Sequence, residues 1–143
     1  MPTPFRTSRM VEFADTDMAG IMHFSAFFRF MEAAEHALVR SLGLSIFGLP
    51  DPDGGEAMIS FPRVSARCDY HSPARCEDVL DLEVMVEKLG TSSVTYGFHF
   101  YLDGEEIAVG QMTSVCCRLQ NSQPPEPLPI PADIVALLKR YAA

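Results

Sequence analysis

Two carboxylates and a glycine lie in a short loop directly before a long apolar segment that is predicted to be helical. The loop contains Asp15, Asp17 and Gly20, and the helix is expected to begin near residues 24–26. The first turn of a helix has unpaired backbone N–H groups and the positive end of the helix dipole. A carboxylate facing such donors suits hydrolysis of an acyl compound through an oxyanion-like transition state. This segment therefore favours an enzyme.

Each residue around this loop also has a structural interpretation. Asp17 can act on a substrate as a nucleophile or a general base, or it can cap the turn before Gly20. Asp15 is interpreted as structural, because it can hold the loop by hydrogen bonds to its own backbone. Gly20 is interpreted as a backbone requirement, since glycine readily adopts left-handed angles. His23 can orient water or substrate, or it can be a partly buried histidine whose hydrogen bonds are satisfied.

The apolar segment follows the helical period from about Ser25 to Leu42. Phe24 and Phe28 add apolar surface near its start, so we expect this helix to be wrapped by other structure. Ser25 is predicted to be the N-cap, and Gly43 is predicted to stop the helix. The apolar residues at three- and four-residue steps are Phe27, Phe30, Met31, Ala34, Leu38 and Leu42.

Extended segments precede and follow this helix. The first covers residues 5–13, and Pro62 in the second implies an edge position or a bulge. Asp103–Gly104 is a strong hairpin signal between the last two. Pro131 opens a short amphipathic helix near the end of the chain. The later extended segments are residues 58–70, 80–86, 94–102 and 107–119.

The order of elements is therefore strand, long helix, four strands and short helix. Consecutive hairpins make the sheet largely antiparallel, and only the long helix is large enough to cover it. The sequence predicts an α+β fold in which one sheet curls around one helix. Sheet edges and one sheet face then remain to be hidden, which favours a homo-oligomer.

The composition fits one globular unit. With 143 residues, of which 48% are hydrophobic and 21% charged, a single domain spanning residues 1–143 can bury a core. A formal net charge of −8 argues against nucleic acid, which requires a basic surface. No run approaches the length of a membrane span, and the N-terminal residues do not resemble a secretory signal. We therefore expect neither nucleic acid nor a membrane as a partner.

The cysteines and histidines follow no metal-binding pattern. Cys116 and Cys117 are adjacent in a predicted strand and point to opposite faces, so we expect neither a bridge nor shared ligation. Reduced thiols favour a cytoplasmic protein. The sequence contains no H-E-x-x-H, C-x-x-C, G-x-S-x-G, P-loop or dinucleotide-binding pattern. We expect no metal and no cofactor.

Several segments together resemble the hotdog-fold acyl-CoA thioesterases, in particular the 4-hydroxybenzoyl-CoA thioesterase family that also contains the YbgC-type thioesterases of bacteria. The resemblance covers most of the chain from about Arg9 to Leu119, and the DTDxxG signature followed by a helix is its most specific part. The matching segments are VEFADTDMAGIMHF with the helix after it, CDYHSPARCEDVLDLEV, KLGTSSV and GQMTSVCCRL.

This resemblance implies a five-stranded antiparallel sheet around a central helix, dimers formed by joining two sheets, and often tetramers. It also implies an active site at the dimer interface. The catalytic carboxylate of the family falls at Asp17, and the N–H that polarises the thioester carbonyl falls at about Phe24. The family often has an aromatic residue followed by histidine or tyrosine where this chain has His23 and Phe24. The role of the His23 side chain is therefore left open.

Coenzyme A carries phosphates that an acidic protein must hold with local positive charge and hydrogen-bond donors. Lys88 and the turn after it are preferred, because similar turns in the family lie near the nucleotide end. Gly20 is expected to border the substrate, while Phe27 and Met58 suit either the core or the wall of an acyl pocket. The turn residues are Gly90, Thr91, Ser92 and Ser93, and the other candidate cations are Arg63, Arg67, Arg75 and Arg118.

The sequence thus predicts a cytoplasmic acyl-CoA thioesterase that forms a homodimer or homotetramer. Two alternatives stay open. The thiol carrier can be an acyl carrier protein, which the lack of an extended basic patch disfavours because the carrier surface is acidic. The chain can also be a non-catalytic acyl-CoA-binding module, which gains nothing from a carboxylate at Asp17 beside a phosphate-rich ligand. The acyl group is not identified by the sequence.

Overall fold

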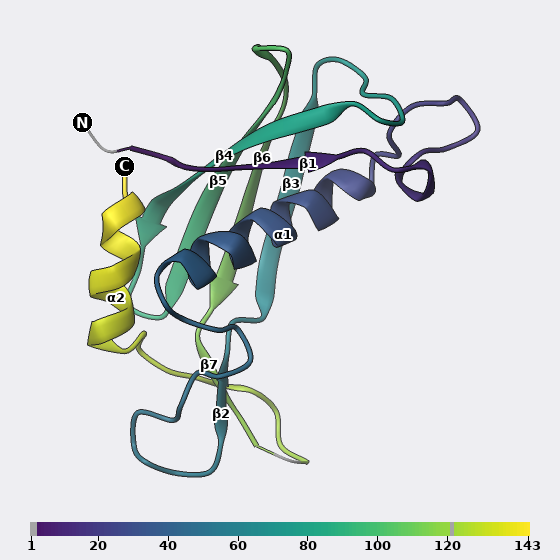
Figure 1. Cartoon of the computed structure of the whole chain (residues 1–143). Coiled ribbons are helices and arrows are strands. Elements are labelled where there is room, and N and C mark those ends of the chain that lie inside the picture. The colour runs from purple at the N-terminus through teal and green to yellow at the C-terminus, as the bar shows by residue number, and fades with distance from the viewer. Residues whose placement is uncertain (1–2, 121) are drawn as a thin grey trace.

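The computed structural model describes residues 3–120 and 122–143 and shows a sheet curled around one helix (Figure 1). The sheet has five strands in the order β1-β4-β5-β6-β3, and all neighbouring strands are antiparallel. This architecture confirms the predicted α+β fold and the five-stranded antiparallel sheet. The strands are β1 (Phe5–Met10), β3 (Arg63–Tyr70), β4 (Val79–Leu89), β5 (Ser93–Leu102) and β6 (Glu105–Val115).

The central helix α1 (Ala26–Ser41) buries a large part of its circumference against the sheet. The inward residues of the strands pack against it, among them Leu82, Val84 and Phe98. Gly43, at a φ of +81°, follows the end of the helix, as the sequence predicts. The buried residues of α1 are Ala26, Phe27, Phe30, Met31, Ala34, Glu35, Leu38 and Val39.

Two of the predicted strands are each divided in two. Residues 58–70 form β2 and β3, and the break includes Pro62, which has no N–H to pair. Residues 107–119 end β6 and form β7, with the break at Cys116. The prediction of uninterrupted strands was therefore wrong, because the short halves leave the main sheet and build a second one in the order β2-β7-β8. These short strands are β2 (Met58–Ser60), β7 (Cys117–Leu119) and β8 (Glu126–Pro127).

The predicted C-terminal helix is present as α2 (Ala132–Leu138), followed by the 3-10 helix η2 (Lys139–Tyr141). Its residues Ile134 and Leu138 are buried in the core. Figure 1 shows α2 at one end of the molecule, beside the C-terminal end of α1 and away from the loop that precedes α1. Within the described residues, no helix combines the length and the apolar character that a membrane crossing requires.

A buried ion pair joins α1 to the edge strand β3. Glu35 is only 4% exposed, and its carboxylate accepts hydrogen bonds from the Arg63 guanidinium at 2.6 and 3.1 Å. Arg63 also donates to Ser114 Oγ at 3.1 Å and to Glu32 at 3.3 Å. A buried charge is tolerated when it is paired and hydrogen-bonded in this way. The Arg63 guanidinium therefore compensates the negative charge of Glu35, which α1 turns toward the sheet.

Gly110 in β6 marks a close approach between the sheet and α1. A Cβ at Gly110 would meet Sδ of the buried Met31 and lie 3.3 Å from the carbonyl oxygen of Arg67.

Gly110→Ala should therefore lower the free energy of unfolding by about 1–3 kcal/mol, measured by urea unfolding. Gly97→Ala in β5 is the control, because its Cβ would meet the exposed, movable side chain of Glu87. Equal losses in both variants would contradict the close approach.

Candidate active site

The loop that carries Asp17 begins where β1 ends. The strand predicted over residues 5–13 stops at Met10, and the chain continues through the short 3-10 helix η1 (Phe13–Asp15). The N–H of Asp17 donates to the carbonyl of Ile21 at 3.0 Å, which closes the loop back on itself. The loop therefore has a defined backbone that leads into the start of α1.

Asp17 occupies the turn of this loop. Its Oδ1 accepts a hydrogen bond from the N–H of Ala19 at 2.9 Å, and its carbonyl accepts one from Gly20 at 3.0 Å. Gly20 has a φ of +77°, the left-handed conformation expected at this position. Asp17 is exposed, and Oδ2 has no hydrogen-bond donor among the residues that the structure describes. One carboxylate oxygen holds the turn, and the other is available to a ligand.

Asp15 has a different environment. It is buried, its Oδ2 accepts the N–H of Glu12 at 2.9 Å, and Arg29 lies 3.7 Å from its Oδ1. Its carbonyl also accepts the N–H of His23 at 2.7 Å. These contacts tie the loop to the start of α1, so the structural interpretation of Asp15 is confirmed.

An open cleft of about 390 Å³ borders Asp17. Its walls are aromatic rings and the segment that follows β3. The cleft therefore lies between the start of α1 and the end of β3. Phe27 packs its ring on Tyr70 at a centroid distance of 4.9 Å and on Phe100 at 5.2 Å. The cleft is lined by Asp17, Ile21, Met22, Phe24, Phe27, Tyr70, His71, Ser72 and Pro73.

The start of α1 presents an unpaired backbone donor at this cleft. Across residues 3–120 and 122–143, no acceptor is found for the N–H of Phe24. Phe24 is 64% exposed, and its carbonyl accepts a hydrogen bond from Tyr70 Oη at 2.9 Å. Phe24 directly precedes the N-cap Ser25, so its N–H lies near the positive end of the helix dipole and suits a partner with negative charge.

His23 lies beside the cleft and is not one of the residues that line it. Its Nδ1 accepts the N–H of Ser25 at 3.2 Å and lies 2.7 Å from Ser25 Oγ. Ser25 is the N-cap residue, as predicted, but it has a helical φ of −73° and its hydroxyl makes no capping hydrogen bond. The expected capping role of its side chain is therefore wrong, because its hydroxyl donates to His23 Nδ1 instead of accepting an N–H of the first turn.

Several residues predicted to bind substrate lie elsewhere in the chain. Met58 is in β2 and borders a separate hollow with Leu119. Lys88 is near the end of β4, and the turn closes where Gly90 N donates to Ser93 O at 2.8 Å. This turn, which contains Gly90, Thr91, Ser92 and Ser93, lies at the opposite end of the sheet from Asp17, because β4 starts beside the end of β1.

Two of the candidate arginines are held in ion pairs. Arg63 binds Glu35, as described above. Arg118 donates to Asp51 at 3.1 and 3.2 Å and also contacts Asp53. The hydrogen bond from Arg118 keeps the pKa of Asp51 below its ordinary value. These contacts fasten the segment after α1 to β7, so neither arginine is well placed to bind phosphate.

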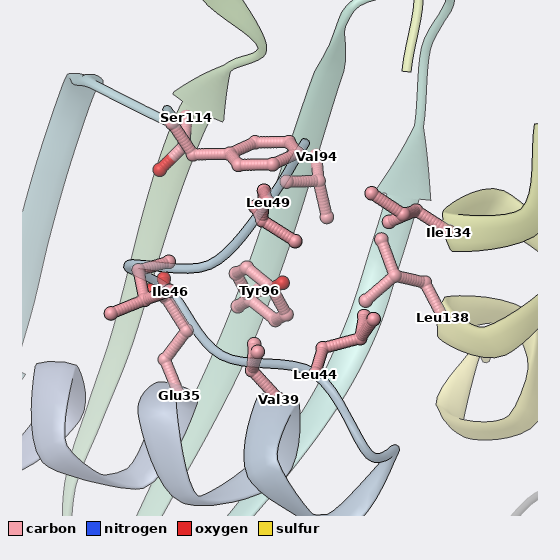
Figure 2. Close-up of a pocket in the computed structure, with 11 residues that line it drawn as sticks. Glu35, Val39, Leu44, Ile46, Leu49, Val94, Tyr96, Ser114, Ile134 and Leu138 are labelled. Carbon is pink, nitrogen blue, oxygen red and sulfur yellow. The ribbon is translucent and has the colours of Figure 1, made fainter. Parts of the chain in front are cut away.

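A second pocket lies between the C-terminal half of α1, α2 and the segment after α1 (Figure 2). Its volume of about 20 Å³ is close to the space that one water needs. Tyr96, Leu49 and Leu138 are among the mainly apolar side chains that point into it. Burial raises the pKa of Tyr96, so this phenol is neutral. The pocket is too small for an acyl group. The Asp17 cleft is the candidate site because it combines a carboxylate with Phe24.

Tyr70 and residues 71–73 are functional candidates that sequence reasoning missed. They belong to the CDYHSPAR block, in which the sequence assigns a possible role only to Arg75, as a candidate cation. A strand that ends in an aromatic residue directly before a Ser-Pro turn was the available signal. The contact between Tyr70 and Phe24, 46 residues apart, could not be read from the chain.

Comparison with known proteins identifies the family. The model of the thioesterase-like superfamily matches residues 11–138. The chain belongs to the thioesterase-like superfamily. This thioesterase is 31% identical to the 1,4-dihydroxy-2-naphthoyl-CoA hydrolase of Thermosynechococcus vestitus, over 92% of its own length and 89% of the relative's.

Solved structures share the fold. A gentisyl-coenzyme A thioesterase superposes with a TM-score of 0.79 at 25% identity, covering 94% of this chain and 99% of that one. A 4-hydroxybenzoyl-CoA thioesterase variant in complex with 4-hydroxybenzoyl-CoA gives 0.80 at 20% identity, covering 95% and 99%. The hotdog fold, the predicted family resemblance and the class of thioester hydrolase are thereby confirmed.

The left-handed backbone at Gly20 generates a test of the loop. Gly20→Ala should lower the free energy of unfolding by about 1 kcal/mol and should also reduce thioesterase turnover, because the strain moves the Asp17 turn. Gly104→Ala in the β5–β6 hairpin is the control, since Gly104 has a φ of +81° and is not one of the residues that line the cleft. The control should lose similar stability and keep its turnover. Thermal unfolding and a thiol-release assay measure both, and loss of turnover in the control would contradict the interpretation.

Proposed function

We propose that this chain hydrolyses acyl-CoA thioesters in the cleft beside Asp17. One observation carries the proposal: Asp17 lines the same cleft as Phe24, whose N–H has no acceptor among the residues that the structure describes. The carboxylate supplies a group that can attack or accept a proton. The N–H supplies a hydrogen bond to the oxyanion that develops on the thioester carbonyl.

Two routes lead to the same products. In the first, Asp17 attacks the carbonyl carbon, the CoA thiolate leaves and takes up a proton, and water hydrolyses the mixed anhydride. In the second, Asp17 removes a proton from water as that water attacks, and the thiolate leaves from the tetrahedral intermediate. Both consume one water and release one free acid and one thiol. In both, the Phe24 N–H stabilises negative charge that is larger in the transition state than in the substrate.

We infer that the acyl group is aromatic. Phe24, Phe27 and Tyr70 give the cleft faces and edges on which an aromatic ring can pack. The three related proteins described above are named for 1,4-dihydroxy-2-naphthoyl-, gentisyl- and 4-hydroxybenzoyl-CoA, which all carry hydroxylated aromatic acyl groups. Hydroxybenzoyl-CoA and hydroxynaphthoyl-CoA thioesters are therefore the substrates to test first, with aliphatic acyl-CoAs as the comparison.

Asp17→Asn tests the catalytic assignment. The amide is a poor nucleophile and a poor base, so kcat for thiol release should fall about 100-fold or more. Asp81→Asn in β4 is the matched control, because Asp81 is exposed and lies outside the Asp17 cleft. Free thiol is measured over a panel of aromatic and aliphatic acyl-CoAs. Thiol release that Asp17→Asn leaves unchanged would refute the role of Asp17.

We further propose that two copies of the chain share each site. The Lys88–Ser93 turn and Asp17 lie at opposite ends of one sheet, so one chain does not bring them together. Strand β3 is at the edge of the sheet, and Val64 in it is 63% exposed. Antiparallel pairing of β3 with its copy would cover the β3 edge of both sheets. It would also bring the far end of the second sheet toward the Asp17 cleft of the first.

Mixing two impaired variants tests the shared site. Asp17→Asn lacks the carboxylate, and Lys88→Glu should bind the CoA phosphates weakly, so each alone should be poorly active at low substrate concentration. After unfolding and refolding together, half of the dimers are mixed, and each mixed dimer has one intact site. The mixture should therefore recover about a quarter of the wild-type activity. A mixture no more active than its parts would refute the sharing.

A further inference from the structure

The peptide between Phe24 and Ser25 is held at both of its polar groups. Its carbonyl oxygen accepts the Tyr70 hydroxyl at 2.9 Å, and its N–H donates to His23 Nδ1 at 3.2 Å. The preceding peptide is held as well, because the carbonyl of His23 accepts the N–H of Ala26 at 2.9 Å. Peptide units are planar and trans, so fixing these groups also fixes the direction of the remaining N–H, that of Phe24.

The roles of the two side chains follow from their hydrogen bonds. A backbone N–H can only donate, so His23 Nδ1 is the acceptor and the Ser25 hydroxyl donates to it as well. Tyr70 donates its only hydroxyl proton to Phe24. Desolvation raises the pKa of Tyr70, which keeps that proton in place near neutral pH. The Tyr70 ring packs edge-on against Phe27, so the donor has a firm support.

This clamp, made of His23 and Tyr70 on the Phe24–Ser25 peptide, connects three parts of the fold. His23 belongs to the Asp17 loop, Phe24 to the start of α1, and Tyr70 to the edge strand β3. We propose that His23 and Tyr70 are positioning residues that aim the Phe24 N–H at the developing oxyanion. Neither touches the reacting atoms. The inference rests on the proposed function and adds two residues that determine how well the site performs it.

Tyr70→Phe removes one hydroxyl and keeps the ring that packs on Phe27. The expected result is a kcat about 3- to 10-fold lower with an unchanged KM, because the misaligned N–H loses more contact with the oxyanion than with the substrate. Tyr101→Phe in β5 is the control, since Tyr101 lies outside the Asp17 cleft and its hydroxyl has no hydrogen bond to the described residues. The control should leave kcat and KM unchanged.

A vibrational measurement separates positioning from a general structural effect. The Asp17→Asn background allows 4-hydroxybenzoyl-CoA, labelled with ¹³C at the thioester carbonyl, to be bound without rapid turnover. Hydrogen bonding from the Phe24 N–H should lower the carbonyl stretching frequency on binding. Adding Tyr70→Phe should return this frequency toward that of the free thioester. A Tyr70→Phe variant with reduced kcat and an unshifted carbonyl band would overturn the positioning role.

His23 offers an independent test with a conservative rescue. His23→Phe removes the acceptor for the Ser25 N–H and should lower kcat with little change in KM. His23→Asn keeps an acceptor that can bond an N–H two residues ahead, as Asp17 does with Ala19, and should restore most of the loss. Equal activity of the two variants would overturn the role of His23. Inactivity of the parent protein on every acyl-CoA would instead refute the proposed function itself.

Discussion

The structure depends on hiding one very apolar helix. Because α1 is buried over much of its circumference, the sheet has to curl around it, and the two ends of the helix emerge at opposite ends of the sheet. The N-terminal end is therefore both exposed and rigidly supported. Just before it, the Phe24 N–H has no acceptor in the described part of the chain and follows a loop that begins where β1 stops. The burial of α1 also explains where the candidate site lies. The backbone donors at a helix start need partners, so this end of the helix faces a cleft instead of the core.

Much of the fold follows from patterns in the sequence. The three- and four-residue spacing from Phe27 to Leu38 specifies the buried face of α1, and the alternation from Leu80 to Val86 specifies the inward face of β4. The glycines at positions 20 and 43 adopt the positive φ values expected of them. Each of these signals is local, because the residues that generate it are neighbours in one element.

The features that sequence did not predict are long-range ones. The division of two strands depends on a second sheet whose partners are far apart in the chain. The contact of Tyr70 with Phe24 depends on how β3 lies against the start of α1. Arg63 and Arg118 are residues of the type that binds phosphate. Only the structure shows that both guanidinium groups are already bound to carboxylates. The turn at Gly20 was predicted from sequence because the residues that form it are consecutive in the chain.

The ion pair of Glu35 with Arg63 has a consequence for the geometry of the cleft. Apolar side chains can exchange neighbours without a large cost, but a desolvated carboxylate has to keep its hydrogen-bonded guanidinium. Loss of the Arg63 guanidinium would leave the buried Glu35 carboxylate without its partner, at a cost of several kcal/mol. The pair thus holds α1 against the edge strand β3. This contact lies more than two turns of α1 away from the cleft, so α1 is joined to β3 at a second place besides the contact of Phe24 with Tyr70.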